Sequence, residues 1–153
     1  MNELKQILLV EDDINDVELT LAALEEHNLA NEVFVVRDGE EALDLLFRRN
    51  TYENLPPGNP CVILLDLKMP KVDGLEVLRQ IRADENLKLI PVIMLTSSRE
   101  ESDLVTSYEL GVSAYVVKPV DFSQFVDAVK KLGLFWAVLN VPPPGCVKKG
   151  KSL

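Results

Sequence analysis

The sequence predicts a doubly wound α/β domain, (βα)5, with five strands in one open parallel sheet and a helix after each strand. Short apolar runs alternate with segments whose apolar residues recur every three or four positions. The apolar runs are uninterrupted, as in strands covered on both faces. Each strand is followed by a helix, which favours parallel pairing with right-handed crossovers. The 153 residues are too few for an eight-unit barrel, which needs about 250.

The first two strand–helix units precede a long loop. Residues 7–10 and 33–36 are apolar runs and predict the first two strands. The first amphipathic helix is expected to end near His27 and Asn28. Residues 50–60 contain Asn, Pro, Gly and Tyr and predict the loop. The apolar positions of the first helix are Ile14, Val17, Leu21 and Leu24, and the second helix carries Ala42, Leu45, Leu46 and Arg49.

The remaining strands are predicted at 62–65, at 92–95, which Pro91 opens, and at 114–117. A weaker helix is expected over about 100–110, with Gly111 as its C-terminal cap. Two other helices follow the third and fifth strands. The apolar positions of these two helices are Leu75, Val77, Leu78 and Ile81 in one, and Phe122, Phe125, Val126, Val129, Leu132 and Trp136 in the other.

The chain is expected to hold one domain, residues 1–137, and a proline-rich, extended C-terminal extension, residues 138–153. It has no apolar run of about 18 residues and no signal-peptide pattern, so we expect a cytoplasmic protein without a membrane partner. The net charge of −9 argues against a nucleic-acid partner. Cys61 and Cys146 are far apart in sequence, and free thiols are expected.

Polar residues follow four of the predicted strands directly. In an open α/β sheet, ligands bind beyond the carboxyl ends of the strands, where the strand order reverses. With the order 2-1-3-4-5, the first and third strands are neighbours, so their terminal acids are expected to meet at one edge. The residues concerned are Glu11, Asp12 and Asp13 after the first strand, Asp66 after the third, Thr96 after the fourth and Lys118 after the fifth.

These residue types together favour phosphoryl chemistry on the protein itself. Crowded carboxylates raise one another's pKa values, and an all-oxygen set open to water suits Mg²⁺. An aspartate can attack phosphorus and form an acyl phosphate. Lys118 and Thr96 could then hold phosphoryl oxygens. Taken singly, each feature has an ordinary explanation, such as acids at a helix N-terminus. Their joint placement after separate strands carries the prediction.

Four segments resemble the motifs of response-regulator receiver domains, in order from about residue 5 to 132. They are Leu-Val-Glu-Asp-Asp at 9–13, Leu-Leu-Asp-Leu-Lys-Met-Pro at 64–70 with Asp73-Gly74, Leu-Thr-Ser at 95–97, and Ala-Tyr-Val-Val-Lys-Pro at 114–119. The resemblance implies a flavodoxin-like fold and a phosphoacceptor role for Asp66. It also implies a Mg²⁺ site with Asp12, Asp66 and the backbone carbonyl of Lys68 as ligands, and with Glu11 acting through water.

The resemblance further implies how phosphorylation would be read. Thr96 and Tyr115 would form a switch pair, in which the hydroxyl moves toward the phosphoryl group and the ring turns inward. Lys118 would pair with a phosphoryl oxygen, and its bond to Pro119 would be cis. Asp13 is not expected to be a ligand. Lys68 lies two positions after Asp66, where aspartyl-phosphate hydrolases carry a second acid, so a turnover enzyme is not expected.

Partners are also implied by the resemblance. The chain looks like a stand-alone response regulator that receives its phosphoryl group from a sensor histidine kinase. The loop at 50–60, Asp16-Val17 and Phe135-Trp136 are similar to the small response regulators that partner cyanobacterial phytochromes, so a phytochrome kinase is expected. The apolar extension suggests a homodimer through the last helix, the last strand and the extension itself. The alternatives are a receiver-like interaction module that is never phosphorylated and a hydrolase.

Overall fold

The computed structural model describes residues 6–26, 32–96, 109–112 and 114–131. Within these residues the sheet has five strands in the order β2-β1-β3-β4-β5, and every neighbouring pair is parallel. The predicted doubly wound (βα)5 fold and its strand order are thereby confirmed. The strands are β1 (Ile7–Val10), β2 (Val33–Val36), β3 (Val62–Asp66), β4 (Val92–Thr96) and β5 (Ala114–Val117).

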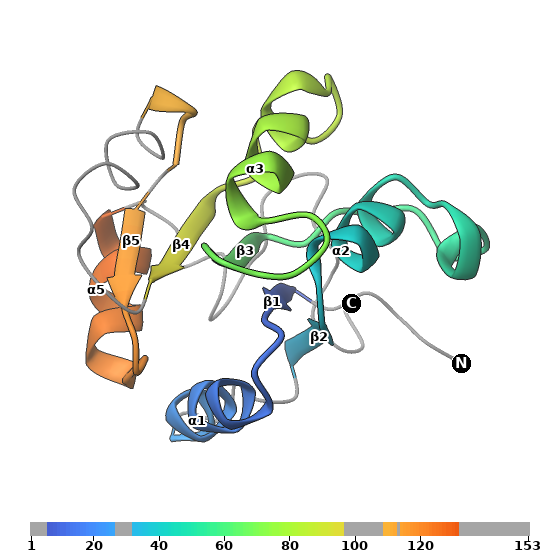
Figure 1. Cartoon of the computed structure of the whole chain (residues 1–153). Coiled ribbons are helices and arrows are strands. Elements are labelled where there is room, and N and C mark those ends of the chain that lie inside the picture. Colours follow the sequence, from blue (N-terminus) through green and yellow to red (C-terminus); the bar gives the residue numbers. More distant parts are fainter. Residues whose placement is uncertain (1–5, 27–31, 97–108, 113, 132–153) are drawn as a thin grey trace, which may run out of the picture.

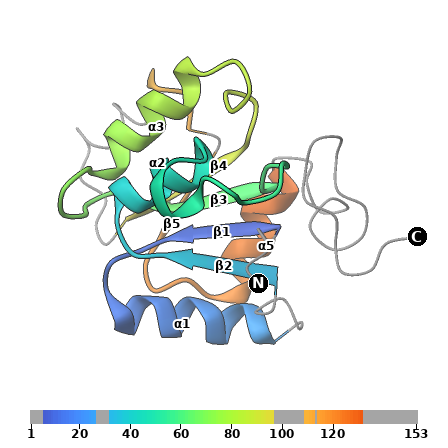
Figure 2. The same ribbon diagram turned by 90° about the vertical axis from the view of Figure 1, so that its right-hand side faces the viewer.

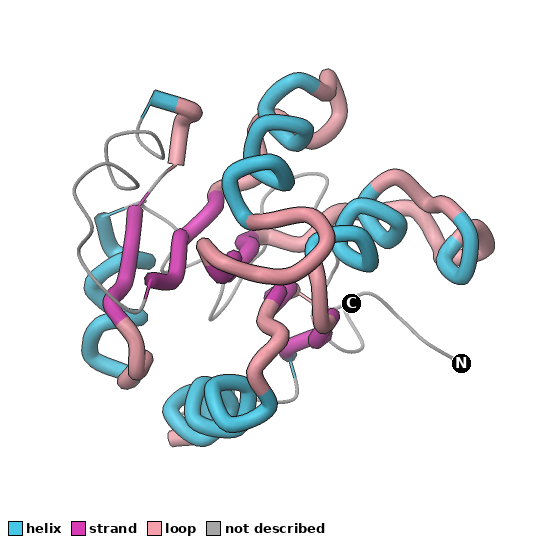
Figure 3. The backbone as a smooth tube through the Cα atoms, viewed as in Figure 1, coloured by secondary structure: helices cyan, strands magenta, loops and turns pink. Residues whose placement is uncertain are grey.

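Helices cover both faces of the sheet, and the strands lie between them (Figure 3). One apolar core joins the sheet to α2 and α3, and a second joins it to α1 and α5 (Figure 1 and Figure 2). Strands buried on both sides need apolar residues at every position, which explains the uninterrupted runs. The helices are α1 (Ile14–Glu25), α2 (Gly39–Leu46), α3 (Gly74–Ala83) and α5 (Phe122–Lys131), with a short 3-10 helix, η2 (Asn50–Tyr52).

The helices α1, α2 and α3 each begin at an aspartate whose carboxylate accepts backbone hydrogen bonds from the first turn, and before α5 Asp121 accepts one from Gln124 in the same way. Asp13 accepts from the N–H groups of Asn15 and Asp16, Asp38 from that of Glu41, and Asp73 from that of Glu76. Such a cap satisfies an otherwise unpaired donor and contributes about 1 kcal/mol. Asp13 is therefore a helix cap. These caps also fix where the loops at the carboxyl edge of the sheet end.

Several predicted boundaries and burial assignments differ from the structure. In α1 the residues Thr20 and Ala23 are buried, whereas Ile14 is 50% exposed. The helix α2 ends at Leu46 and does not reach Arg49, because the chain leaves the helix at Arg48, which has a φ of +56°. The Arg48 side chain then donates to backbone carbonyls of the following loop, at Pro56 and Gly58. Periodicity alone does not predict such a turn.

Some expectations fall partly or wholly outside the described residues. The helix predicted over about 100–110 lies almost wholly in the segment 97–108, although Gly111 does adopt the left-handed φ of +88° that a helix cap uses. The last helix was expected to reach Trp136, and the structure describes α5 as far as Lys131. The boundary at 137, the extension 138–153 and Cys146 also lie beyond it. Cys61 is buried and, within the described residues, forms no disulfide, as expected. In the described part of the chain, no helix has the length and apolarity to cross a membrane.

Candidate functional site

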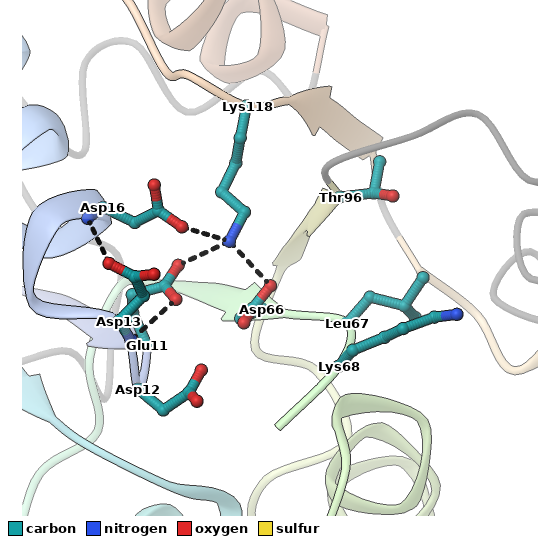
Figure 4. A pocket seen from close by; sticks show the side chains of 9 residues that line it. All are labelled: Glu11, Asp12, Asp13, Asp16, Asp66, Leu67, Lys68, Thr96 and Lys118. Carbon is teal, nitrogen blue, oxygen red and sulfur yellow. Dashed lines mark hydrogen bonds and ion pairs between the residues drawn. The ribbon is translucent and has the colours of Figure 1, made fainter. Parts of the chain in front are cut away.

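The predicted site residues meet in an open pocket of about 310 Å³ at the carboxyl edge of the sheet. The pocket lies where β1 and β3 are neighbours and the strand order reverses (Figure 4). Its position follows from the topology, because parallel strands bring all their carboxyl ends to one edge. The pocket is lined by Glu11, Asp12, Asp13, Asp16, Asp66, Leu67, Lys68, Thr96 and Lys118.

Three carboxylates from two neighbouring strands crowd together in this pocket. One oxygen each of Glu11, Asp12 and Asp66 lies within 4.8 Å of the others. Glu11 is fully buried and Asp66 is 4% exposed, whereas Asp12 is half-buried. Burial, followed by the negative charge of Asp66, raises the pKa of Glu11 to about 7. Burial also raises the pKa of Asp66. The cluster therefore holds more negative charge than its surroundings readily stabilise.

Lys118 is the cation that faces these acids. Its Nζ lies 3.1 Å from Glu11 Oε1, 3.2 Å from Asp66 Oδ1 and 2.8 Å from Asp16 Oδ2. Burial alone would lower the pKa of Lys118, but the hydrogen bond to Asp16 and the charge of Asp66 raise it above its ordinary value. The ammonium group therefore stays charged across the neutral range. The peptide bond from Lys118 to Pro119 is cis, as the family resemblance implied.

Asp16 belongs to the site, although the sequence reasoning did not assign it a role there. It stands in the first turn of α1, three residues after the cap Asp13 and four residues after Asp12, which precedes the helix. That spacing is the only signal in the sequence. Its partner Lys118 is 102 residues away, so the contact could not be inferred from local pattern. Asp16 helps to hold the lysine at the rim of the pocket (Figure 4).

The other predicted residues occupy different positions around the cluster. Thr96 is buried at the end of β4 and lines the pocket. Lys68 also lines it, but its side chain points away from the acids (Figure 4). Tyr115 is half-buried on β5 and pairs with Met94 of β4. Thr96 pairs with Val117, two positions further along β5. It packs against the core on the α3 side and does not line the pocket.

The donor set fits a small, hard cation. Three carboxylates within reach of one another supply oxygen ligands only, and the pocket is open to water, which Mg²⁺ retains in its coordination shell. A divalent cation would also relieve the repulsion that raises the Glu11 and Asp66 pKa values. The described residues at this site contain no thiol and no imidazole that would favour a softer metal.

The fold has three layers, with the sheet between two layers of helices, and it carries acids, a hydroxyl and a lysine at its switch point; the comparison with known families identifies its class. The response regulator receiver domain model matches residues 7–130. This match spans most of the chain, and the chain therefore belongs to the response-regulator receiver family.

Curated and solved relatives are small response regulators. The chain is 41% identical over 135 residues to response regulator Rcp1 of Synechocystis sp., covering 88% of this chain and 90% of that protein. The bacteriophytochrome response regulator RtBRR is 67% identical with a TM-score of 0.80, covering 93% of this chain and 86% of that chain. The structure of the phosphorylated cyanobacterial phytochrome response regulator RcpA is 43% identical with a TM-score of 0.71, covering 86% and 93%. A Mn²⁺-bound structure of Rcp1 has a TM-score of 0.73 at 40% identity and covers 92% and 99%.

The raised pKa of Glu11 predicts how a divalent cation affects stability at different pH values. A carboxyl whose folded pKa is about 7, against an ordinary 4.5, contributes stability that is complete below pH 4.5. That contribution is lost as the pH rises through 7, because the buried group must then ionise. A divalent cation such as Mg²⁺, bound by the ionised cluster, would restore stability. We therefore expect Mg²⁺ to raise the Tm more at about pH 8 than at about pH 6, measured by calorimetry.

Glu11→Gln is the control, because it removes the titrating group while keeping the shape of the side chain. In that variant the Mg²⁺-induced change in Tm should differ less between the two pH values than in the wild-type protein, and the remaining difference would come from Asp66, whose pKa is also raised. If Mg²⁺ raised the Tm of the wild-type protein equally at both pH values, the raised pKa of Glu11 would be contradicted.

Proposed function

We propose that this protein is a response regulator of a two-component phosphorelay, phosphorylated on Asp66 in a Mg²⁺-dependent reaction. The observation that carries the proposal is the setting of Asp66, a nearly buried carboxylate with acids on one side and an ammonium group on the other. A purely structural role would not require so many buried charges. The resulting change of surface would then transmit the signal to a partner.

The metal ligands we propose are Asp12, Asp66 and the backbone carbonyl of Lys68, with Glu11 acting through water. The oxygen-only cluster supports this assignment, as does the Mn²⁺-bound form of the relative Rcp1. Bound Mg²⁺ would supply positive charge that neutralises the oxygens of the incoming phosphoryl group. Asp12 and Glu11 would hold the site in place, and Asp66 would keep one oxygen directed at phosphorus.

In the reaction, a carboxylate oxygen of Asp66 forms a bond to phosphorus while the bond from phosphorus to the donor nitrogen breaks. The electron pair of the broken bond goes to the donor imidazole. Lys118 is 3.2 Å from Asp66 and is already charged, so it can bind a phosphoryl oxygen without a proton transfer. Thr96 lies in the same pocket and can donate its hydroxyl to another oxygen. The protein's contribution is mainly positioning and charge.

The switch we propose uses Thr96 and Tyr115. Thr96 would move toward the phosphoryl group and vacate space on its inner side, and the Tyr115 ring would turn inward. The two residues lie on the neighbouring strands β4 and β5, which supports a coupling between them. Tyr115 lies outside the pocket, so it would report the state of Asp66 at the surface of β5 without touching the reacting atoms.

We propose that Asp66 is the phosphoacceptor, and Asp66→Asn should therefore abolish labelling by a small phosphodonor. Intact mass after incubation with acetyl phosphate should show a Mg²⁺-dependent gain of one phosphoryl group per wild-type chain, and none in the variant. The substitution is nearly isosteric, so the fold should be kept. Asp127→Asn, at an exposed position of α5, is the matched control and should label normally.

Labelling of Asp66→Asn at the wild-type level would show that another residue is the acceptor. Repeated turnover of a phosphomonoester would favour a hydrolase, whereas no labelling in any condition would favour an interaction module that is never phosphorylated.

The variant Lys118→Ala should lose the conformational response to phosphorylation more than it loses the uptake of phosphate. Uptake is measured by intact mass as above, and the conformational response is measured by hydrogen exchange. A full response in that variant would remove Lys118 from the mechanism.

We propose a phytochrome-type sensor histidine kinase as the phosphodonor. The proteins RtBRR and RcpA are described as phytochrome response regulators, and the chain is 67% and 43% identical to them. We expect faster phosphotransfer to this chain from a bacterial phytochrome kinase than from an unrelated histidine kinase, by at least tenfold in kcat/KM, a difference of about 1.4 kcal/mol. Radiolabel transfer measured over a time course tests this. Equal or slower transfer would contradict the assignment.

We further propose a homodimer through α5, β5 and the C-terminal extension, in a cytoplasmic protein. The strand β5 lies at the edge of the described sheet, where a second chain could approach it. We expect light scattering to give twice the chain mass in at least one phosphorylation state, and removal of residues 138–153 to weaken the assembly. A monomer in both states at high concentration would contradict the dimer.

A further inference from the structure

The turn between β2 and α2, residues 37–39, lies beside both loops that carry the proposed metal ligands. The sequence showed only a turn here, and the proposed function gave it no role. In the structure one of its residues contacts the backbone of Asp12, and another lies against the loop between β3 and α3. A segment that touches both sides of a metal site can determine the relative positions of its ligands.

The first contact is made by Arg37. Its guanidinium Nη2 donates a hydrogen bond of 2.8 Å to the backbone carbonyl of Asp12. Asp12 is the least buried of the three clustered acids, so packing restrains it less than it restrains Glu11 or Asp66. The hydrogen bond fixes the peptide group from which the Asp12 carboxylate extends. Hydrogen bonds with an ionised donor are among the stronger ones in proteins.

Arg37 is itself held in place by a short hydrogen-bonded chain. Its backbone N–H donates to Glu41 Oε1 at 2.9 Å, and Tyr52 donates its hydroxyl to Glu41 Oε2 at 2.6 Å. The Tyr52 ring packs edge-on against Phe34 of β2. Burial and the hydrogen bond to Glu41 raise the pKa of Tyr52, so its hydroxyl remains a donor. The loop that follows α2 is thereby linked through Glu41 and Arg37 to Asp12.

The second contact is made by Gly39 and its neighbour Asp38. A side-chain carbon at Gly39 would lie 2.0 Å from the carbonyl oxygen of Val72, so only glycine allows this approach. The Lys71 ammonium lies 3.6 Å from the Asp38 carboxylate. The close approach at Gly39 packs the turn against the loop that begins after Asp66 and contains Lys68, and the ion pair lies at the same junction. The turn is thus in contact with the loop on each side of the acidic cluster.

We propose that Arg37 is a positioning residue of the metal site, which orients Asp12 through its backbone carbonyl and is held by Glu41 and Tyr52. The inference rests on the proposed function, since it assumes that the cluster binds Mg²⁺. A positive charge near a divalent cation also acts against binding. Arg37 is exposed, however, so water and salt screen its charge, whereas the hydrogen bond is short and direct. Orientation of the ligand therefore outweighs charge repulsion.

The test is a calorimetric titration of the full chain with Mg²⁺ alone. Loss of a residue that orients a metal ligand typically weakens affinity by 10- to 100-fold, and this backbone contact should lie near ~10-fold for Arg37→Ala. Arg37→Lys keeps a donor and a charge and should recover part of the affinity. Tyr52→Phe acts one step further away and should give a smaller loss in the same direction. Arg79→Ala is the matched control, because Arg79 is exposed and pairs within α3.

The thermal stability of each variant without metal separates positioning from general damage to the fold. Arg37→Ala should bind Mg²⁺ more weakly while its metal-free Tm stays close to that of the Arg79→Ala control. Unchanged or tighter Mg²⁺ binding by Arg37→Ala would overturn the inference, and so would a lowered Tm with unchanged affinity. Failure of the wild-type chain to bind Mg²⁺ or to be labelled on Asp66 would overturn the proposed function instead.

Discussion

The site depends on the repulsion among three carboxylates that the sheet brings to one edge. Burial leaves Glu11 and Asp66 with too little water to stabilise their charges, and their pKa values rise. Lys118 relieves part of this cost through contacts of 3.1 Å and 3.2 Å. The balance is incomplete, since one ammonium group faces Asp16 as well as the two buried acids. Incomplete compensation leaves negative charge that a divalent cation can stabilise.

The fold creates this constraint with simple means. A parallel sheet places all carboxyl ends on one side, and the order β2-β1-β3-β4-β5 makes β1 and β3 neighbours at the reversal point. Rigid strands therefore carry Glu11 and Asp66, while helix caps such as Asp13 end the adjoining loops. The charged groups can be held close together because the apolar cores on both faces of the sheet fix the strands that carry them.

Much of the fold could be predicted from the sequence, because buried parallel strands leave uninterrupted apolar runs. Given the strand order of the doubly wound fold, which the apolar runs alone do not specify, the meeting of Glu11, Asp12 and Asp66 could also be predicted. The prediction that the second helix extends to Arg49 was wrong, because the end of α2 depends on the left-handed conformation of Arg48, which periodicity does not encode. The contacts of Asp16 and Arg37 were missed for another reason. Their partners are distant in sequence, so no local pattern shows them.

Lys118, the cation that compensates the buried acids, is synthesised long after the acids themselves. Lys118 pairs with Glu11, which lies 107 residues earlier. A nascent chain that already contains β1 and β3 can bring its acids together before the lysine has been made. Such an intermediate has two buried carboxylates without their cation, which is strongly unfavourable. Stable folding therefore waits for the last strand, and a protein truncated before it would be a substrate for cellular proteases.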